Sequence, residues 1–321
     1  MVKSRIEETR AQRFIDSTNP DGTFSVPLRY YAAHTGRFGG SDKINLQNLP
    51  RGSQLRRAIM APPGQRLYIA DLSNIEARML AWLAKEHDLV QAFATGRDVY
   101  CEFASQIYGR TITKDDKLER YVGKTAILGL GYGMGADKFQ MTLKTGSPSV
   151  EVTDATAQAI VMQYRSMYPN IPKLWSGMKD SLFQMLNPRS VGMMYGPLTI
   201  RSKALGLPNG MALNYPNLYF SAGQFMYSTE RETIRTHGPR VTENVVQALA
   251  RLVITDQMLE VQNLPEVDIV LQVHDEIIAI GSEHNADATM DKIIEIMRTA
   301  PEWCGDLPLD AEGGASQIYD K

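Results

Sequence analysis

Two strongly β-favouring segments at opposite ends of the chain constrain its fold most. Residues 66–71 (Arg-Leu-Tyr-Ile-Ala-Asp) have the pattern of a buried strand, and residues 267–280 have the pattern of two apolar strands joined by a tight turn. Between them, residues 79–235 are mostly of helical pattern. Strands at both ends with helices between them predict an α+β fold, because the outer parts can form one sheet while the helical middle is inserted as a second lobe.

Local signals add detail to this outline. Ser73 and Glu76 have the spacing of a capping box at the start of a helix. Residues 1–34 look poor in helix, and residues 35–65 look like an ordered loop region rich in Gly, Pro, Asn and Arg. We further expect short strands at 191–200 and 212–220, and helices at 84–108, 115–130, 154–167, 171–186, 241–262 and 286–299.

Composition excludes several classes of protein. The chain has 321 residues, of which 43% are hydrophobic and 22% charged, enough for a sizeable core. It has no apolar run long enough to span a membrane and no apolar leader, so we expect a soluble protein of the cytoplasm, that of a bacterial host if the gene is carried by a phage. Cys101 and Cys304 lack the spacing of a zinc site or a disulfide framework.

Charge is distributed unevenly along the chain. The net charge is −2, yet residues 1–78 carry twelve Lys or Arg against seven Asp or Glu. A basic track through an otherwise acidic protein would suit nucleic acid, although a solvated face explains the same numbers.

Two carboxylates stand at the ends of the apolar strands. Asp71 ends the first, and Asp275 lies in the turn between the other two, beside His274 and Glu276. Carboxylates held on a partly buried scaffold need a cation or hydrogen-bond donors, and a pair of them suits Mg²⁺ that also binds substrate phosphates. Equally, Asp71 could simply precede a helix and Asp275 simply occupy a turn.

A row of side chains four residues apart follows in the helical middle. Arg120, Lys124, Leu128 and Tyr132 fall on one slowly drifting helix face, with charges for phosphates and apolar surface for a sugar and base. The alternative is an ordinary solvated basic stripe. Three glycines at 129, 131 and 133 would each cost such a helix about 1 kcal/mol relative to Ala, so they need another reason.

Two familiar phosphate-binding motifs fail in this region. The Gly-Lys-Thr at 123–125 lacks the earlier glycine of a Walker A loop, since Leu118 stands there. The glycines at 129–135 do not follow a strand, as a dinucleotide-binding loop requires. ATPase and dinucleotide-binding functions are therefore disfavoured.

Taken in order, the segments resemble family A DNA polymerases, the group of bacterial DNA polymerase I and many phage replicases. Residues 35–37 (Thr-Gly-Arg) and 45–50 (Asn-Leu-Gln-Asn-Leu-Pro) resemble the conserved segment that precedes the first motif. Residues 71–78 resemble motif A, residues 120–133 motif B and residues 272–276 (Gln-Val-His-Asp-Glu) motif C. The resemblance runs from about residue 28 to the C-terminus, and residues 242–248 are similar to phage-type members.

The resemblance implies a right-hand architecture that serves template-directed DNA synthesis, here expected in phage replication. It assigns residues 1–27 to a segment near the thumb, 28–78 and 236–321 to an antiparallel-sheet palm, and 79–235 to mainly helical fingers. The implied cofactors are two Mg²⁺ ions, with Mn²⁺ as an alternative, and the implied partners are primer–template DNA and dNTPs.

Site residues follow from the motif match. Metal ligands would be Asp71, Asp275 and the Leu72 carbonyl, with Glu276 supporting catalysis and Lys124 assisting the leaving pyrophosphate. Glu76 would close the space at the sugar 2′ position. The implied nucleotide-binding residues are Arg120, Lys124, Leu128, Tyr132, Glu76 and Leu72, and the implied DNA-binding residues are Arg37, Gln47, Asn48, Gln247 and His274.

The chain departs from the family pattern in three ways. Leu128 stands where the family usually has Phe or Tyr, and Glu243 stands where many members have Asn. The third departure is that the resemblance begins where the family's thumb ends and includes no exonuclease domain. Either the chain is a fragment or split gene product, with a separate partner chain that supplies the thumb and exonuclease, or it works as a weakly processive core.

Three other functions remain open at this point. A single-subunit RNA polymerase shares related motifs, although Glu76 disfavours a 2′-hydroxyl. A non-catalytic nucleic-acid-binding fragment of a split polymerase would keep the motifs without activity. A two-metal nuclease would use the paired carboxylates but would leave the row from Arg120 to Tyr132 unexplained.

Overall fold

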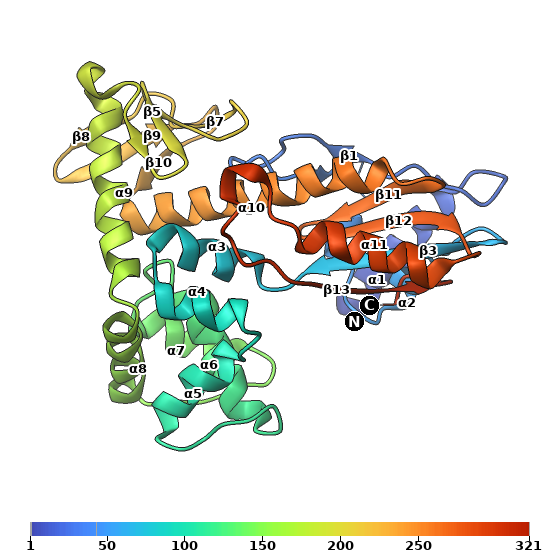
Figure 1. Ribbon diagram of the computed structural model, residues 1–321, viewed down its shortest axis with the longest axis horizontal. Coiled ribbons are helices and arrows are strands. Elements are labelled where there is room, and N and C mark those ends of the chain that lie inside the picture. The colour runs from blue at the N-terminus through green and yellow to red at the C-terminus, as the bar shows by residue number, and fades with distance from the viewer. Residues whose placement is uncertain (1, 43, 321) are drawn as a thin grey trace. The chain divides into compact units, whose positions relative to one another are not determined.

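The computed structural model describes residues 2–42 and 44–320 (Figure 1). The chain divides into two compact units. We call the first the sheet unit, which comprises Met1–Ser73, Arg251–Pro301 and Asp310–Lys321. The second, the helical unit, comprises Asn74–Ala250 and Glu302–Leu309.

A four-stranded antiparallel sheet forms the centre of the sheet unit. Its strand order is β11-β12-β3-β13, so one strand from the first part of the chain lies between strands from the last part. The α+β class and the joining of the two outer parts in one sheet are therefore confirmed. The strands are β3 (Gln65–Leu72), β11 (Val267–Val273), β12 (Glu276–Ser282) and β13 (Ala311–Ser316).

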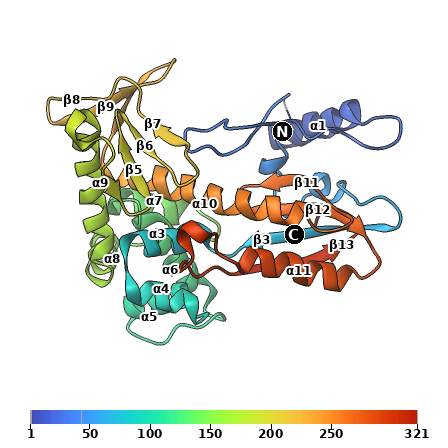
Figure 2. The ribbon, with the colours of Figure 1, turned by 45° about the horizontal axis from the view of Figure 1, so that its top comes forward.

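The two faces of this sheet bury different partners because successive side chains of a strand point to opposite sides. Leu67 and Ile69 of β3, with Ile278 of β12, belong to one core cluster with apolar residues of 44–61 and Tyr319. The helix α11 (Ala286–Arg298) packs against β3 and β13, and Figure 2 shows it running alongside β13. Its Met290, Ile293 and Met297 are buried.

The first part of the chain contains a helix that the sequence analysis did not predict. Residues 2–17 form α1 (Val2–Ser17), so the expectation of a helix-poor entry segment was wrong. Charged residues dominate the sequence of α1, so it lacks the clear pattern of apolar residues on one face that predicts a helix. A turn follows directly, where the Gly22 amide donates to the Asn19 carbonyl. Short elements then lead to β3: β1 (Leu28–Arg29), β2 (Gly39–Gly40), η1 (Leu46–Asn48) and α2 (Gln54–Arg57).

Seven helices make up the first part of the helical unit: α3 (Ile75–Ala84), α4 (His87–Ala94), α5 (Val99–Tyr108), α6 (Lys117–Leu130), α7 (Ala136–Thr145), α8 (Asp154–Met167) and α9 (Asn170–Leu186). The single helix expected at 84–108 is two helices, because the chain turns at Gly96, whose φ is +69°. The predicted capping box of Ser73 and Glu76 stays a prediction: the helix α3 is preceded by Asn74, which makes no side-chain cap, and the Ser73 amide donates to the Asp310 carbonyl.

Residues 194–236 contain more strand than the sequence predicted. After the short 3₁₀ helix η2 (Pro188–Ser190), they form two small antiparallel sheets, of order β4-β5-β6-β7 and β10-β9-β8. Apolar side chains such as Leu198, Leu205 and Leu213 are fully buried there. The strands are β4 (Met194–Tyr195), β5 (Leu198–Arg201), β6 (Ala204–Gly206), β7 (Ala212–Asn214), β8 (Tyr219–Ser221), β9 (Gln224–Ser228) and β10 (Thr233–Thr236).

The longest helix, α10 (Gly238–Gln262), begins in the helical unit and continues into the sheet unit. The short 3₁₀ helix η3 (Glu302–Cys304) belongs to the helical unit. No helix within the described part of the chain is both long and apolar enough to cross a membrane.

Candidate active site

The end of β3 meets the turn between β11 and β12. Glu276 is the register partner of Asp71, and the Leu72 amide donates to the Asp275 carbonyl with an N–O distance of 3.0 Å. The turn contains only two residues, His274 and Asp275, and His274 adopts a left-handed conformation with φ +57°. The structure therefore brings Asp71, Leu72 and Asp275 together at one end of the sheet.

Asp71 is a largely buried carboxylate, which a nearby cation would stabilise. It follows Leu67 and Ile69 on one face of the strand, and its side chain is only 16% exposed. Nη2 of Arg51 lies 3.8 Å from its Oδ2. The Arg51 side chain is 74% exposed, so this long contact contributes little to stability, and another cation can readily take the place of Arg51.

These groups fit a divalent ion that also takes oxygens from a substrate. Across residues 2–42 and 44–320, no group of three or more His, Cys, Asp or Glu side chains is arranged to hold a metal ion. Mg²⁺ binds through one or two carboxylates together with substrate phosphates and water, and it does not need a cage made wholly of protein. Asp71, Asp275 and the Leu72 carbonyl are the candidate donors.

Glu276 is held in a buried cluster beside this pair. Its Oε1 lies 3.1 Å from Nη2 of Arg56 and accepts a hydrogen bond from the Tyr319 hydroxyl. The Arg56 guanidinium also stacks over the Tyr319 ring at 3.8 Å from the ring centroid. Burial and the neighbouring Glu276 raise the pKa of Tyr319 above its ordinary value, so this hydroxyl stays protonated and donates. Sequence analysis missed Arg56 and Tyr319, which lie far from Glu276 in the chain.

A chain of side-chain amides supports the turn. Nε2 of Gln47 donates to the Gln272 carbonyl at 3.1 Å, and Nε2 of Gln272 donates to the His274 carbonyl. Gln47 is only 7% exposed, whereas Asn48 and His274 are exposed and Arg37 is half-buried. These four residues belong to the sheet unit, and Gln247, also half-buried, belongs to the helical unit.

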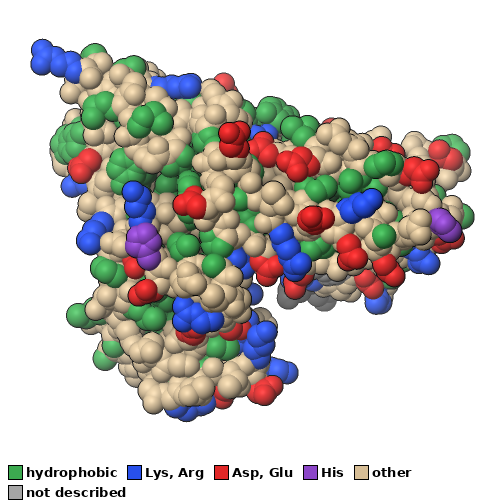
Figure 3. Space-filling model, in the orientation of Figure 1, with side chains coloured by type: hydrophobic (Ala, Val, Ile, Leu, Met, Phe, Trp, Pro, Cys, Tyr) green, Lys and Arg blue, Asp and Glu red, His purple; other side chains and the backbone are tan. Residues whose placement is uncertain are grey.

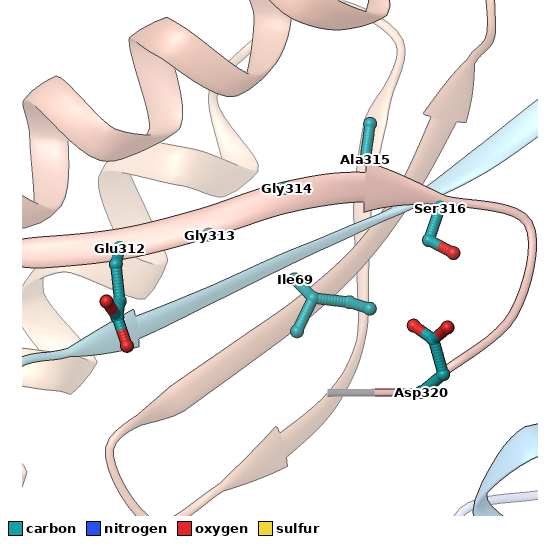
Figure 4. Close-up of a pocket in the computed structure, with 7 residues that line it drawn as sticks. All are labelled: Ile69, Glu312, Gly313, Gly314, Ala315, Ser316 and Asp320. Carbon is teal, nitrogen blue, oxygen red and sulfur yellow. The ribbon is translucent and has the colours of Figure 1, made fainter. Parts of the chain in front are cut away.

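A pocket of about 500 Å³ lies along β13 in the same unit (Figure 4). Ile69, Gly313, Gly314, Ala315 and Ser316 line it, and Glu312 and Asp320 supply its acidic groups. Glu312 is a register partner of Asp71, so Glu276, Asp71 and Glu312 form one row across three strands. Sequence analysis gave no signal for Glu312, because its partner strand lies far away in the chain.

The row from Arg120 to Tyr132 lies on α6 and the residues that follow it. Arg120 is half-buried, Lys124 is exposed and Leu128 is 38% exposed. Tyr132 follows the end of the helix and is half-buried. Lys124 makes no hydrogen bond or ion pair with any described residue, so its ammonium group is available for a ligand.

Arg120 is oriented by residues at the start of the neighbouring helix α5. Its Nε lies 2.9 Å from Oδ2 of Asp98, and its guanidinium lies 5.3 Å from the centroid of the Tyr100 ring. Burial alone would raise the pKa of Asp98, but the Cys101 amide and the Arg120 guanidinium stabilise the anion and lower that pKa below its ordinary value. Burial raises the pKa of Tyr100 to about 12, and its hydroxyl donates to Oδ1 of Asn74.

Sequence analysis missed this arrangement. Asp98 could be recognised as a helix cap, since its side chain accepts from the Tyr100 and Cys101 amides, but nothing in the sequence pairs it with Arg120. Glu76 lies in the first turn of α3 and is half-buried, in the same unit as α6.

Surface charge does not identify a nucleic-acid track by itself. On the face seen in Figure 3, acidic and basic side chains are interspersed rather than gathered by sign. The candidate site is therefore defined by local geometry and not by a basic surface patch.

Known proteins similar to this chain are DNA polymerases. A DNA polymerase of Bacillus phage SP02 is 28% identical over 94% of this chain and 53% of its own length. DNA polymerase I of Pseudomonas aeruginosa is 27% identical over 99% of this chain and 32% of its own length. The chain thus spans about half or less of the length of these relatives.

A solved structure shares the fold. It is the POL domain of Pol1 from M. smegmatis in a complex with DNA primer–template and dNTP, and it matches 99% of this chain and 51% of its own chain with a TM-score of 0.75. The sequence identity is 23%, so this likeness concerns the fold alone. A family model described as DNA polymerase family A matches residues 4–321, and the chain therefore belongs to DNA polymerase family A.

Proposed function

We propose that this chain catalyses template-directed DNA synthesis, in which dNTPs are added to a primer 3′-hydroxyl. The observation that carries the proposal is the junction of β3 with the β11–β12 turn, where the Leu72 amide meets the Asp275 carbonyl and Asp71 ends the same strand. We assign the palm function to the sheet unit and the fingers function to the helical unit. The similarity to a phage polymerase supports a role in phage DNA replication.

Asp71, Asp275 and the Leu72 carbonyl would hold two Mg²⁺ ions, or Mn²⁺ in their place. When bound, such ions make the primer hydroxyl a better nucleophile and neutralise the leaving pyrophosphate. The chain's own contribution is to fix Asp71 on β3 and Asp275 in the tight turn that is hydrogen-bonded to the end of that strand, so that both carboxylates are positioned before the substrate binds.

Glu276 acts in this proposal by positioning the turn. Arg56 and Tyr319 already use its carboxylate, and its side chain is only 4% exposed. A buried carboxylate in this setting stabilises the strand next to Asp275 without being a ligand itself.

The incoming nucleotide would lie along α6. Arg120 would grip its phosphates, with its guanidinium pre-oriented by Asp98 and Tyr100. Lys124, which is exposed, would donate a proton to the leaving pyrophosphate or stabilise its charge. Leu128 and Tyr132 would face the sugar and base, and Glu76 would exclude a 2′-hydroxyl.

Primer–template DNA would contact Arg37, Asn48, Gln247 and His274. Gln47 differs from these residues, because its side chain is buried and donates to Gln272. We therefore assign Gln47 to positioning the His274 turn instead of to direct DNA contact, which revises the role implied by the family resemblance.

Primer extension by the full chain tests the proposal. With Mg²⁺ and a primed template, we expect dNTP incorporation in preference to rNTP incorporation. Asp275→Ala and Asp71→Ala should each reduce incorporation below detection while DNA binding, measured by gel shift, is retained. Asp291→Ala is the matched control, because it removes an exposed carboxylate of α11 in the same unit.

Each competing function has its own outcome in this experiment. Preferential rNTP incorporation would identify an RNA polymerase, and strand degradation without dNTP-dependent growth would identify a nuclease. DNA binding without any metal-dependent incorporation would identify a non-catalytic fragment. Retained synthesis by Asp275→Ala would remove Asp275 from the metal site.

A further inference from the structure

A buried arginine on α10 takes no part in the functions proposed above. Arg251 lies in the part of α10 that belongs to the sheet unit, and the residue is only 6% exposed. Removing a guanidinium from water is costly unless hydrogen-bond acceptors, anions or aromatic faces compensate the charge. The groups that surround Arg251 should therefore indicate what its charge contributes.

Two aromatic rings of the β1–β2 hairpin face this guanidinium. Its Cζ lies 5.2 Å from the centroid of the Tyr30 ring and 5.6 Å from the centroid of the Phe38 ring. The two rings contact each other edge to face, with centroids 5.6 Å apart. A cation within about 6 Å of a ring centroid is attracted by the negative face of the ring. Since Tyr30 directly follows β1 and Phe38 directly precedes β2, Arg251 holds both ends of the loop between these strands.

The charge of Arg251 also reaches a third aromatic residue of this loop. Burial raises the pKa of Tyr31 above its ordinary value, and the Arg251 guanidinium partly offsets this rise. Tyr31 has φ +53°, a left-handed conformation that a bulky residue adopts only with support from its surroundings. A Cβ at Gly36, whose φ is +80°, would lie 2.8 Å from Cε2 of Tyr31, so this ring packs against the backbone just before Arg37.

The backbone of Arg37 is tied to the same loop. The Ala32 and Ala33 amides donate to the Arg37 carbonyl at 3.0 and 3.2 Å, and the Gly36 amide donates to the Ala33 carbonyl at 2.9 Å. Arg37 is half-buried and precedes Phe38 in the chain. A shift of the Phe38 ring would therefore move Arg37 as well.

Packing alone does not require an arginine at position 251. An apolar side chain of similar length would fill the space without the cost of burying a charge, and such replacements are often neutral or stabilising. A cation shared by two rings favours one arrangement of those rings, because the attraction depends on the guanidinium facing both of them. The charge thus selects one conformation of the loop.

We propose that Arg251 is a positioning residue for primer–template binding, which stacks against Tyr30 and Phe38 and so holds the loop that presents Arg37 to the duplex. The inference rests on the proposed function, in which Arg37 contacts primer–template DNA. Because Arg251 is buried, it acts through the loop and does not contact DNA itself.

Fluorescence anisotropy of primer–template DNA tests this role. Arg251→Met keeps the length of the side chain and removes the charge, and we expect it to bind DNA about 5- to 10-fold more weakly. Gln257→Met is the matched control. Gln257 is another buried polar residue of α10 in the sheet unit, and its Nε2 donates to the Met297 and Thr299 carbonyls at 2.9 and 3.2 Å. Thermal unfolding should show a loss of stability in the control, while its affinity for DNA stays that of the wild type. An equal loss of affinity in both variants would overturn the proposal.

A double-mutant cycle asks whether Arg251 acts through Arg37. In an Arg37→Gln background, Arg251→Met should change the affinity for DNA less than about 2-fold, because the residue that the loop positions is already gone. Additive losses would overturn the proposal, since Arg251 would then act on DNA by another route.

Variants of Tyr30 approach the same contact from its exposed side. Tyr30 is 62% exposed, so its replacement should affect folding little. Tyr30→Phe keeps the ring and should bind DNA as the wild type does. Tyr30→Leu removes the aromatic face and should bind about 3-fold more weakly, again without further effect in the Arg37→Gln background. Wild-type affinity of Tyr30→Leu would overturn the role of the stacked rings.

The rate of incorporation separates positioning of DNA from the chemical step. At saturating primer–template, Arg251→Met should incorporate dNTPs at the wild-type rate, because the end of β3 and the β11–β12 turn are held by other contacts. Only the DNA concentration needed for half-maximal rate should rise. A lower saturated rate with unchanged affinity for DNA would overturn the proposal.

The same measurements distinguish failure of this inference from failure of the proposed function. If the wild-type chain incorporates dNTPs and the losses of Arg251→Met and Arg37→Gln are additive, only the positioning role is wrong. If incorporation is absent while the two losses are coupled, the positioning role is supported and the catalytic proposal fails. Unchanged DNA binding by Arg37→Gln would overturn both the duplex contact of Arg37 and this inference, whatever the result for incorporation.

Discussion

Each unit contains an arginine, a carboxylate and a tyrosine in contact, and the two sets differ in burial. Arg56 and Glu276 have side chains that are 5% and 4% exposed, with Tyr319 stacked 3.8 Å from the guanidinium. Arg120 and Asp98 are 32% and 19% exposed, with Tyr100 at 5.3 Å. The separations of the charged atoms are similar, 3.1 and 2.9 Å.

This difference in burial suits the two sets to different roles, one as a rigid support and the other as a binding site. Breaking a buried ion pair leaves an uncompensated charge, so the set in the sheet unit is fixed and suits a scaffold for Asp275. The half-buried pair of Arg120 and Asp98 is weaker and more easily exchanged, so Arg120 can turn from Asp98 towards a phosphate at a lower cost than Arg56 could leave Glu276. In the proposed function, the same three kinds of side chain would therefore give rigidity in one unit and bind a ligand in the other.

Removing one partner of the buried set should have the largest effect. Glu276→Ala leaves Arg56 buried without its carboxylate, and we expect the free energy of unfolding to fall by about 3–5 kcal/mol. Chemical denaturation measures this change. The double variant Arg56→Met/Glu276→Leu removes both charges and should recover most of the loss; a double variant as unstable as Glu276→Ala would contradict the role of the charge.

Lys124 tests the ligand-binding side of the comparison. Because it is exposed and unpaired among the described residues, Lys124→Ala should leave stability unchanged but slow dNTP incorporation about 100-fold, the range of general acid catalysis. Single-turnover primer extension gives the rate. Lys117→Ala, on the same helix, is the matched control, and equal rates for the two variants would exclude the role of Lys124.

Tyr319→Phe sharpens the comparison within the buried set. It removes the hydroxyl that donates to Glu276 and keeps the ring under Arg56, so we expect a loss of about 1–2 kcal/mol in the free energy of unfolding. Thermal and urea unfolding both report it. No loss would indicate that Arg56 alone satisfies the carboxylate.

The smallest effect is expected at Asp98. Asn is an equally good helix cap, so Asp98→Asn removes the charge and keeps the cap, and the cost should be about 0.2–1 kcal/mol. Because the pKa of Asp98 is lowered in the folded protein, its contribution is present above the ordinary value of 3.8 and is lost as pH falls through the folded pKa. The difference in melting temperature between wild type and variant should therefore shrink below that pH; a constant difference would point to packing instead of charge.

The strands at the two ends of the chain were predictable because their apolar residues are continuous and their turn is polar. The approach of Asp71 to Asp275 followed from the family resemblance, and the structure supplies the register that joins them. Sequence periodicity failed for α1, whose charged residues bury little, and for residues 224–236, whose strands gain their partners only in the folded unit.

Partners distant in sequence were beyond prediction. A carboxylate at the start of an apolar strand, such as Glu276, signals that a cation must meet it, but nothing local selects Arg56 over the other arginines. The hydrogen bond from the Ser73 amide to the Asp310 carbonyl was unpredictable for the same reason, because Asp310 belongs to the last part of the chain.

The central position of β3 also sets an order of events during synthesis on the ribosome. Both strands that flank it, β12 and β13, are made only after residues 74–250 have been translated. The nascent chain can therefore form most of the helical unit while the apolar β3 has neither of its neighbouring strands. An unpaired apolar strand invites association with other chains. We expect translation of the last quarter of the chain to be the step most exposed to aggregation and most responsive to chaperones.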